Sequence, residues 1–182
     1  MKSLAIGVIL FCVATLASAS DPAEIVKKMI GYEYTFVYPI TSSEDPLPGL
    51  GDCVDEGGGM VGDTADGFGA SIIRCGKNRL LVLDRTVSQE NGRLRNRILD
   101  AIVLPKYDRY GTSNNNKELL PNGMCTFDGD YKKDMRVLVR FGKRERITSK
   151  NGVLTAWGFD LEKGKIIKLD TSHIVCEQPD EP

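Results

Sequence analysis

The 182 residues contain only one histidine and one tryptophan, and they lack most of the local motifs that carry enzyme chemistry. The patterns G-x-S-x-G, S-x-x-K, H-E-x-x-H and G-x-x-x-x-G-K-[ST] are all absent. No C-x-x-C spacing occurs either. A single histidine would add only one ligand to any cysteines that bound a zinc ion. The sequence therefore argues against serine hydrolase, zinc protease and phosphate-loop mechanisms.

Long apolar runs are missing after the N-terminus. At the N-terminus itself, Lys2 precedes an apolar run over 4–16, and Ala17-Ser18-Ala19 has the small-x-small form of a cleavage site. This layout predicts a signal peptide over residues 1–19, since about 13 apolar residues are too few to cross a bilayer comfortably. Cys12 lies inside the run, which argues against a lipoprotein anchor. We expect a periplasmic or secreted protein with no membrane span after signal removal.

The charge balance is close to zero, with a formal net charge of −1, and together with export this argues against a nucleic-acid partner. The charges are nevertheless segregated along the chain. Residues 21–66 hold ten acidic and two basic residues, whereas 74–109 hold nine basic and four acidic ones. Arg93, Arg95 and Arg97 alternate along an expected strand, which favours a solvated sheet face. A polyanionic envelope component or an acidic protein remains an alternative partner for the basic half.

Four cysteines remain once the signal peptide is removed: Cys53, Cys75, Cys125 and Cys176. An even number in an exported chain predicts two disulfides, and three pairings are possible. We favour Cys53–Cys75 and Cys125–Cys176, because each bond joins the start of a loop-rich stretch to a strand that follows. Each closure is worth about 3–4 kcal/mol on the loop-entropy estimate.

The mature chain is expected to form a single mostly-β domain over 20–182. Its first residues, DPAEIVKKMIG, predict one short amphipathic helix capped by Asp21 and ended by Gly31, which covers a sheet. After it, apolar residues recur with a period of two. The expected strands are YEYTFVY, ASIIRC, RLLVLDRTV, RILDAIVLP, MRVLVRF, VLTAWGFDL, KIIKLD and HIVCE. The pattern predicts an antiparallel sandwich or small barrel, stapled by disulfides, with Gly164 in a hairpin turn.

Two of these strands show their faces clearly. In MRVLVRF, Met135 and Val137 share a face, and Arg136 and Arg140 lie on the other. In VLTAWGFDL, Trp157 is expected to fill the core between sheets. His173 follows a turn that contains Asp170, and together with Cys176 this C-terminal group favours a structural role over a catalytic one.

Residues 39–69 differ from the rest, with eight glycines, three prolines, seven carboxylates and no lysine or arginine. This composition predicts a long Gly/Asp-rich loop pinned by one disulfide. Calcium is a possible ligand of its carboxylates, although the order of an EF-hand loop is missing. The other functional interpretation is a negative surface for a protein partner. The candidate partner-binding residues are Asp52, Asp55, Glu56, Asp63 and Asp66.

A carboxylate-based hydrolase remains an alternative. Asp84, Asp100 and Asp160 lie within apolar strands, where burial could raise a carboxyl pKa. Spacing alone does not pair them.

From Ile98 onward, the succession of ILDAIVLP, Cys125, AWGFD with a glycine-bearing turn, and IVC resembles small exported proteobacterial proteins of unknown function. The likeness implies no activity. In size, compartment and all-β pattern the chain is also similar to periplasmic lysozyme inhibitors, but their Ser-Gly and Tyr-rich inhibitory motif is not found here.

Taken together, these features predict an exported, non-catalytic binding protein, with an inhibitor or immunity-type protein for an envelope or secreted enzyme as its expected form. The alternatives are a calcium- or envelope-ligand-binding module, a carboxylate-based hydrolase, and a structural or assembly protein of the envelope.

Overall fold

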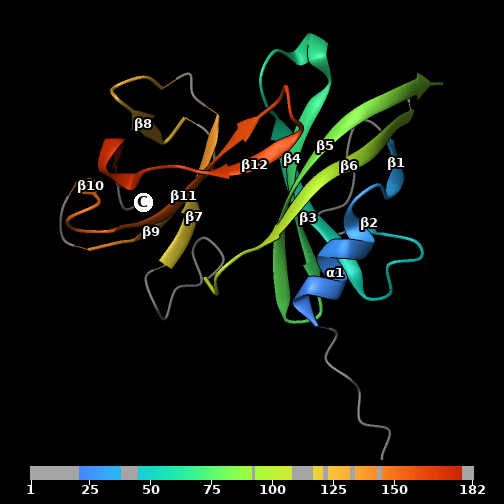
Figure 1. The fold of residues 1–182 in the computed structure, drawn as a ribbon, viewed down its shortest axis with the longest axis horizontal. Helices are drawn as coiled ribbons and strands as arrows, with labels where there is room; N and C mark the ends of the chain where they lie inside the picture. Colours follow the sequence, from blue (N-terminus) through green and yellow to red (C-terminus); the bar gives the residue numbers. More distant parts are fainter. Residues whose placement is uncertain are drawn as a thin grey trace, which may run out of the picture.

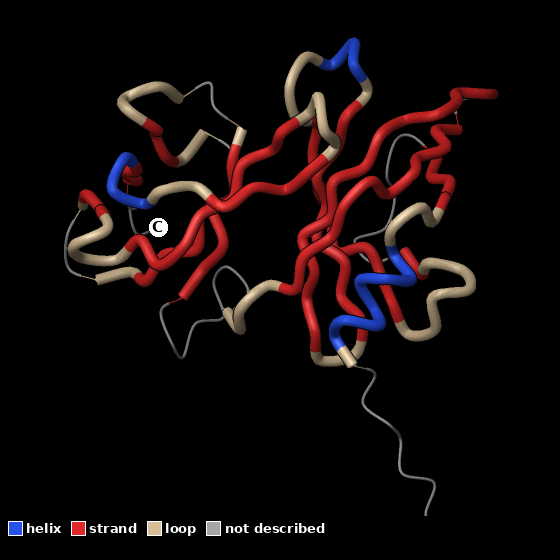
Figure 2. The backbone as a smooth tube through the Cα atoms, in the orientation of Figure 1, coloured by secondary structure: helices blue, strands red, loops and turns tan. Residues whose placement is uncertain are grey.

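The computed structural model describes residues 21–37, 45–91, 93–107, 117–120, 123–131, 134–142 and 145–177. The expected signal peptide over 1–19 lies outside these ranges. Within them the chain forms one α-helix, two 3-10 turns and strands that pair into antiparallel sheets (Figures 1 and 2). The predicted mainly β fold with one short N-terminal helix is confirmed.

The largest sheet has six strands and curls into a half-barrel. Its order is β1 (Glu33–Val37), β6 (Arg93–Val103), β5 (Asn78–Glu90), β4 (Phe68–Cys75), β3 (Cys53–Met60) and β2 (Asp45–Pro46). A four-stranded sheet contains β12 (Lys165–Lys168), β11 (Val153–Asp160), β9 (Met135–Arg140) and β7 (Lys117–Leu120). A three-stranded sheet contains β10 (Arg146–Thr148), β13 (Ile174–Glu177) and β8 (Cys125–Phe127).

The helix α1 (Pro22–Met29) covers one face of the six-stranded sheet, as its sequence predicts (Figure 1). Asp21 caps it by accepting a hydrogen bond from the backbone N–H of Ala23 at 3.1 Å. Ile25 and Met29 are buried against the sheet. Ile30 is 46% exposed because the helix has already ended.

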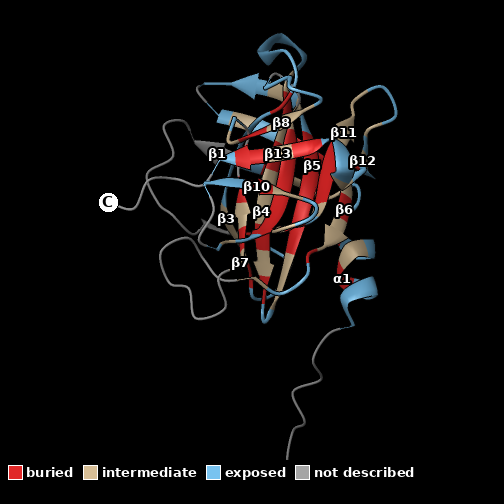
Figure 3. Cartoon of the chain, turned by 90° about the vertical axis from the view of Figure 1, so that its left-hand side faces the viewer, coloured by how far each residue is buried: buried red, intermediate tan, exposed pale blue. Residues whose placement is uncertain are grey.

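Three apolar cores separate the layers. The helix-side core lies between α1 and the six-stranded sheet, the central core between the six- and four-stranded sheets, and the outer core between the four- and three-stranded sheets. Strand β5 contributes to the first two, because Leu80 and Val82 face the helix side while Leu81 and Leu83 face the central core. The buried strands at the centre of the molecule are visible in Figure 3.

Trp157 lies in the central core with 8% exposure, which confirms its predicted place between sheets. On β9, Met135 and Val137 share the outer core as expected. Arg140 on the opposite face is exposed, but Arg136 on that same face is buried. Arg136 is buried because β9 belongs to an inner layer that is covered on both sides. Burial lowers the pKa of its guanidinium.

The disulfides pair as predicted, Cys53 with Cys75 and Cys125 with Cys176. Each bond joins residues directly opposite one another on neighbouring antiparallel strands, β3 with β4 and β13 with β8. The Cα atoms are 4.1 and 4.0 Å apart. One bond therefore ties β3 to β4 within the half-barrel, and the other ties β8 to β13 within the three-stranded sheet.

Candidate functional site

The acidic segment is not the continuous loop that its composition predicts. Residues 39–44 lie outside the described residues, but Cys53–Met60 form strand β3, which pairs with β4. The loop prediction is wrong here because a neighbouring strand supplies hydrogen-bond partners that override the low strand propensity of glycine. A bulge between Asp55 and Gly58 takes up the extra residues, with Gly57 at a φ of 109°.

Two of the five candidate carboxylates bind other groups of the protein itself. The side chain of Glu56 is 8% exposed and binds two guanidinium groups, Arg74 at 2.9 Å and Arg79 at 2.7 Å. Asp55 is half-buried and accepts a hydrogen bond from the backbone N–H of Gly57 at 2.8 Å. Neither carboxylate is available to a partner without breaking these contacts.

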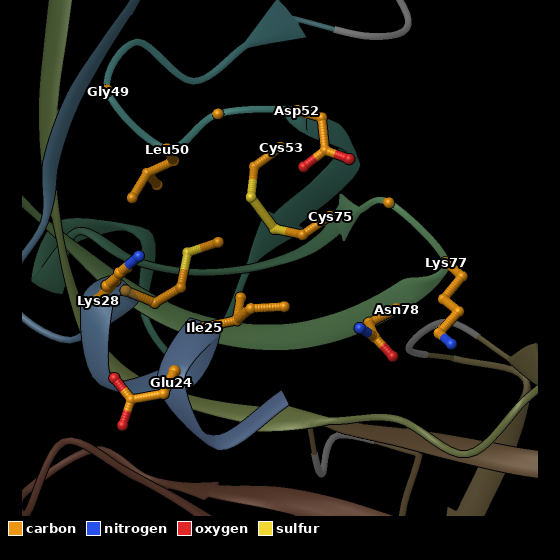
Figure 4. Close-up of a pocket in the computed structure, with 13 residues that line it drawn as sticks. Glu24, Ile25, Lys28, Gly49, Leu50, Asp52, Cys53, Cys75, Lys77 and Asn78 are labelled. Carbon is orange, nitrogen blue, oxygen red and sulfur yellow. A yellow bond between two sulfur atoms is a disulfide. The ribbon is translucent and has the colours of Figure 1, made fainter. Parts of the chain in front are cut away.

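Asp52 lies apart, on the rim of a hollow beside the first disulfide (Figure 4). This hollow of about 450 Å³ is bounded by α1, the turn before β3 and the β4–β5 turn. Its charged lining residues are Glu24, Lys28, Asp52 and Lys77. Two carboxylates and two ammonium groups balance, so the hollow does not select a ligand by charge.

Asp63 and Asp66 lie at the opposite end of β3, on the 3-10 turn η1 (Thr64–Asp66). We call residues 62–67 the acidic tip. Both side chains are exposed, and neither has an ion-pair partner among the described residues. The five carboxylates predicted as one surface are thus split between two ends of the half-barrel.

The acidic tip has a fixed shape. Asp63 accepts a hydrogen bond from the backbone N–H of Ala65 at 3.0 Å, and Arg85 donates to the backbone oxygen of Asp66 at 3.3 Å. The N–H of Gly62 donates to the Asp134 carboxylate, which ties the tip to the chain before β9. These contacts hold the backbone of the tip and the Asp63 side chain in place before any partner arrives.

Asp84, one of the proposed catalytic carboxylates, lies inside the half-barrel with 1% exposure. The Tyr34 hydroxyl donates to it at 2.8 Å and the Asn96 amide at 2.9 Å. Burial raises the pKa of Asp84 to about 6, and the charge of Asp55 pushes it the same way. A Cβ at Gly69 would lie 2.8 Å from Asp84 Oδ1, so the backbone itself seals the carboxyl group.

Asp100 and Asp160 serve the hairpin β11–β12. Asp100 binds the Ile166 N–H at 2.9 Å and Lys165 Nζ at 3.3 Å, which attaches β12 to β6. Asp160 closes the β11–β12 turn through the backbone N–H and the ammonium of Lys163, and these hydrogen bonds hold the pKa of Asp160 below its usual range. Gly164 occupies this turn with a φ of 61°, as predicted.

His173 ends the 3-10 turn η2 (Thr171–His173), which Asp170 caps. Its Nδ1 lies 2.6 Å from Asp128 Oδ1, and its ring stacks on Phe127 at 5.4 Å between centroids. The hydrogen bond to Asp128 raises the pKa of the imidazole, and the charge of Asp128 adds to that effect. The Asp128 N–H also donates to the His173 backbone oxygen at 2.9 Å, so the contact joins β13 to the turn after β8.

Sequence reasoning missed a group of cations near the β4–β5 turn, among them Lys77, Lys106 and Lys117. The sequence separates them by up to 40 residues, and none of them belongs to a recognisable binding motif. Only the meeting of the two main sheets brings them together. The overall excess of positive charge in 74–109 was the one available signal.

Among the described residues, no three histidine, cysteine or carboxylate side chains are grouped so that they could hold a metal ion. No helix in the described ranges is long and apolar enough to span a bilayer. Comparison with protein-family models, with curated proteins and with solved structures found no match to this chain.

Proposed function

We propose that the protein is an exported, non-catalytic binding protein that acts on a basic protein partner through the acidic tip. An inhibitor or immunity-type role toward an envelope or secreted enzyme is the form we favour. The observation that carries the proposal is the pair Asp63 and Asp66, which the β3–β4 connection presents on a rigid turn without neutralising them.

An adjacent apolar side chain supports a protein as the partner. Met60, at the end of β3, is 47% exposed although it is large and flexible. Methionine adapts its shape to an apolar surface, whereas the two carboxylates would steer a positively charged one. A protein enzyme with a basic rim around its substrate site offers both kinds of contact.

The test is affinity capture with the oxidised mature protein on envelope extract and culture supernatant, followed by mass spectrometry. We expect one basic partner at stoichiometric amounts, released by high salt. The double variant Asp63→Asn/Asp66→Asn should lose it, and its association rate with the purified partner should fall about tenfold at low ionic strength. Asparagine retains the side-chain oxygen that caps η1, so the turn should persist.

A matched control removes two charges elsewhere. Glu90→Gln/Glu145→Gln alters two exposed carboxylates outside the tip and should capture the partner at the wild-type rate. Equal capture by wild type and by the tip variant would refute the role of Asp63 and Asp66. Capture that resists high salt would refute electrostatic steering.

A further inference from the structure

A second hollow lies where the six-stranded and four-stranded sheets part, at the end of the half-barrel away from the acidic tip. Its volume is about 640 Å³. The β4–β5 turn, the chain that follows β6 and the first residue of β7 bound it. Figure 1 shows the chain after β6 leaving the large sheet toward the region of β7. We call this the basic hollow.

The lining is cationic. Lys77, Arg79, Lys106 and Lys117 contribute four positive charges, and the described lining residues include no carboxylate. Lys77 and Lys106 are exposed and Lys117 is half-buried. None of the three lysines has an ion-pair partner among the described residues. Lysines gathered without counter-charges repel one another, and an anion bound among them would relieve that repulsion.

One wall of the hollow is rigid. Arg79 donates to Glu56 at 2.7 Å and to the backbone oxygen of Tyr107 at 3.3 Å, and its guanidinium lies 5.0 Å from the centre of the Tyr107 ring. The Leu104 N–H donates to the Arg79 backbone oxygen at 2.8 Å. Glu56 also binds Arg74, so its charge is divided between two guanidinium groups.

Apart from Asn78, the rest of the lining consists of Leu104, Pro105 and Tyr107. Leu104 is buried in the central core, Tyr107 packs against the same core, and Pro105 lies between them in sequence. The hollow thus offers mobile ammonium groups, which bind phosphate as point charges, beside a ring and an aliphatic surface. An inorganic ion would use only the first feature. An organic phosphate would use both.

We infer that the basic hollow binds a phosphate ester that carries a small apolar or ring-shaped group. The phosphate lies among Lys77, Lys106 and Lys117, and the organic group packs on Tyr107 and Pro105. This chemistry is shared by soluble phosphate monoesters and by lipid headgroups that carry a phosphate monoester. The inference is independent of the acidic tip, which lies at the other end of β4.

Calorimetric titration with phenyl phosphate, pyrophosphate and inorganic phosphate tests the site on the oxidised mature protein. Phenyl phosphate should bind about tenfold more tightly than inorganic phosphate, because only its ring covers the apolar wall. The variant Lys77→Gln/Lys106→Gln/Lys117→Gln should lose at least about tenfold in affinity for phenyl phosphate. Because Lys117 belongs to a strand, Lys77→Gln/Lys106→Gln serves as a second variant confined to exposed side chains, with a smaller loss expected.

The control is Lys27→Gln/Lys150→Gln/Lys168→Gln, which removes three exposed ammonium groups outside the hollow. An equal loss of affinity in this control, or no measurable binding of phenyl phosphate, would overturn the proposal. Sedimentation with phosphatidic acid vesicles then identifies the source of the ligand. Retention on these but not on phosphatidylcholine vesicles assigns a lipid headgroup, and phenyl phosphate binding without vesicle retention assigns a soluble ester. Both of these results support a phosphate ester site.

Discussion

The buried Asp84 gives the protein a pH-dependent stability that can be isolated by one substitution. In the folded chain the pKa of Asp84 is raised to about 6, from an ordinary value of 3.8, chiefly by burial. A group whose pKa is raised on folding binds its proton more tightly in the folded state. Its contribution to stability is therefore complete below about pH 4 and is lost as the pH rises through 6.

The magnitude follows from the size of the shift. Roughly two pKa units at 1.36 kcal/mol each give about 3 kcal/mol of stability lost between pH 4 and pH 7. In Asp84→Asn this titration is absent, while Tyr34 can still donate its hydroxyl proton to the amide oxygen. The difference in unfolding free energy between variant and wild type should therefore move by about 3 kcal/mol in favour of the variant over that range.

Urea unfolding at several pH values, followed by tryptophan fluorescence, measures this difference, because Trp157 is buried in the central core. Titrating groups that do not interact with Asp84 are common to both proteins, and their contributions cancel. Asp66→Asn, which removes an exposed carboxylate outside the half-barrel interior, is the control. A difference between Asp84→Asn and wild type that stays constant from pH 4 to pH 7 would refute the reasoning.

Three further predictions concern the half-barrel and the disulfides. A Cβ at Gly58 would approach backbone and side-chain atoms of β4 to 2.4 Å, whereas one at Gly59 meets nothing within 4 Å. Gly58→Ala should thus cost about 2 kcal/mol in chemical unfolding and Gly59→Ala under about 0.5 kcal/mol; equal costs would contradict the close approach. Glu56→Gln leaves two guanidinium groups without their carboxylate and should cost about 2 kcal/mol by the same assay, and an unchanged midpoint would show that the pair is not structural. Replacing Cys125 and Cys176 by alanine opens a closure of 51 residues and should lower the unfolding free energy by about 4 kcal/mol; a loss under 1 kcal/mol would refute the loop-entropy estimate.

Local patterns were enough to predict most strands. Alternation identified β9, β11 and β13 because each has at least one continuous apolar face, and the hairpin at Gly164 followed from its turn residues. The disulfide pairing was also correct, since each bond connects neighbouring strands. The strands and the hairpin depend on short stretches of chain, which a sequence displays directly.

Features that depend on layering were not predictable. β3 contains three consecutive glycines, and only the partner strand β4 makes it a strand. The two faces of β9 were predicted, but the burial of Arg136 on one of them depends on a second sheet that covers it. The basic hollow joins Lys77, Lys106 and Lys117 from three separate elements. For Arg136 and the basic hollow, the deciding contacts are distant in sequence, so no local pattern carries them.

The segment Leu80–Leu83 of β5 is buried on both faces, and this shapes how the molecule can open. Its side chains alternate between the helix-side core and the central core, so one backbone supports both. Loosening of either core displaces that backbone and disturbs the other. We therefore expect α1, the half-barrel and the facing four-stranded sheet to exchange their amide protons as one cooperative unit. The three-stranded sheet contributes only to the outer core, so its amides should exchange first, although Cys125–Cys176 keeps β8 and β13 joined.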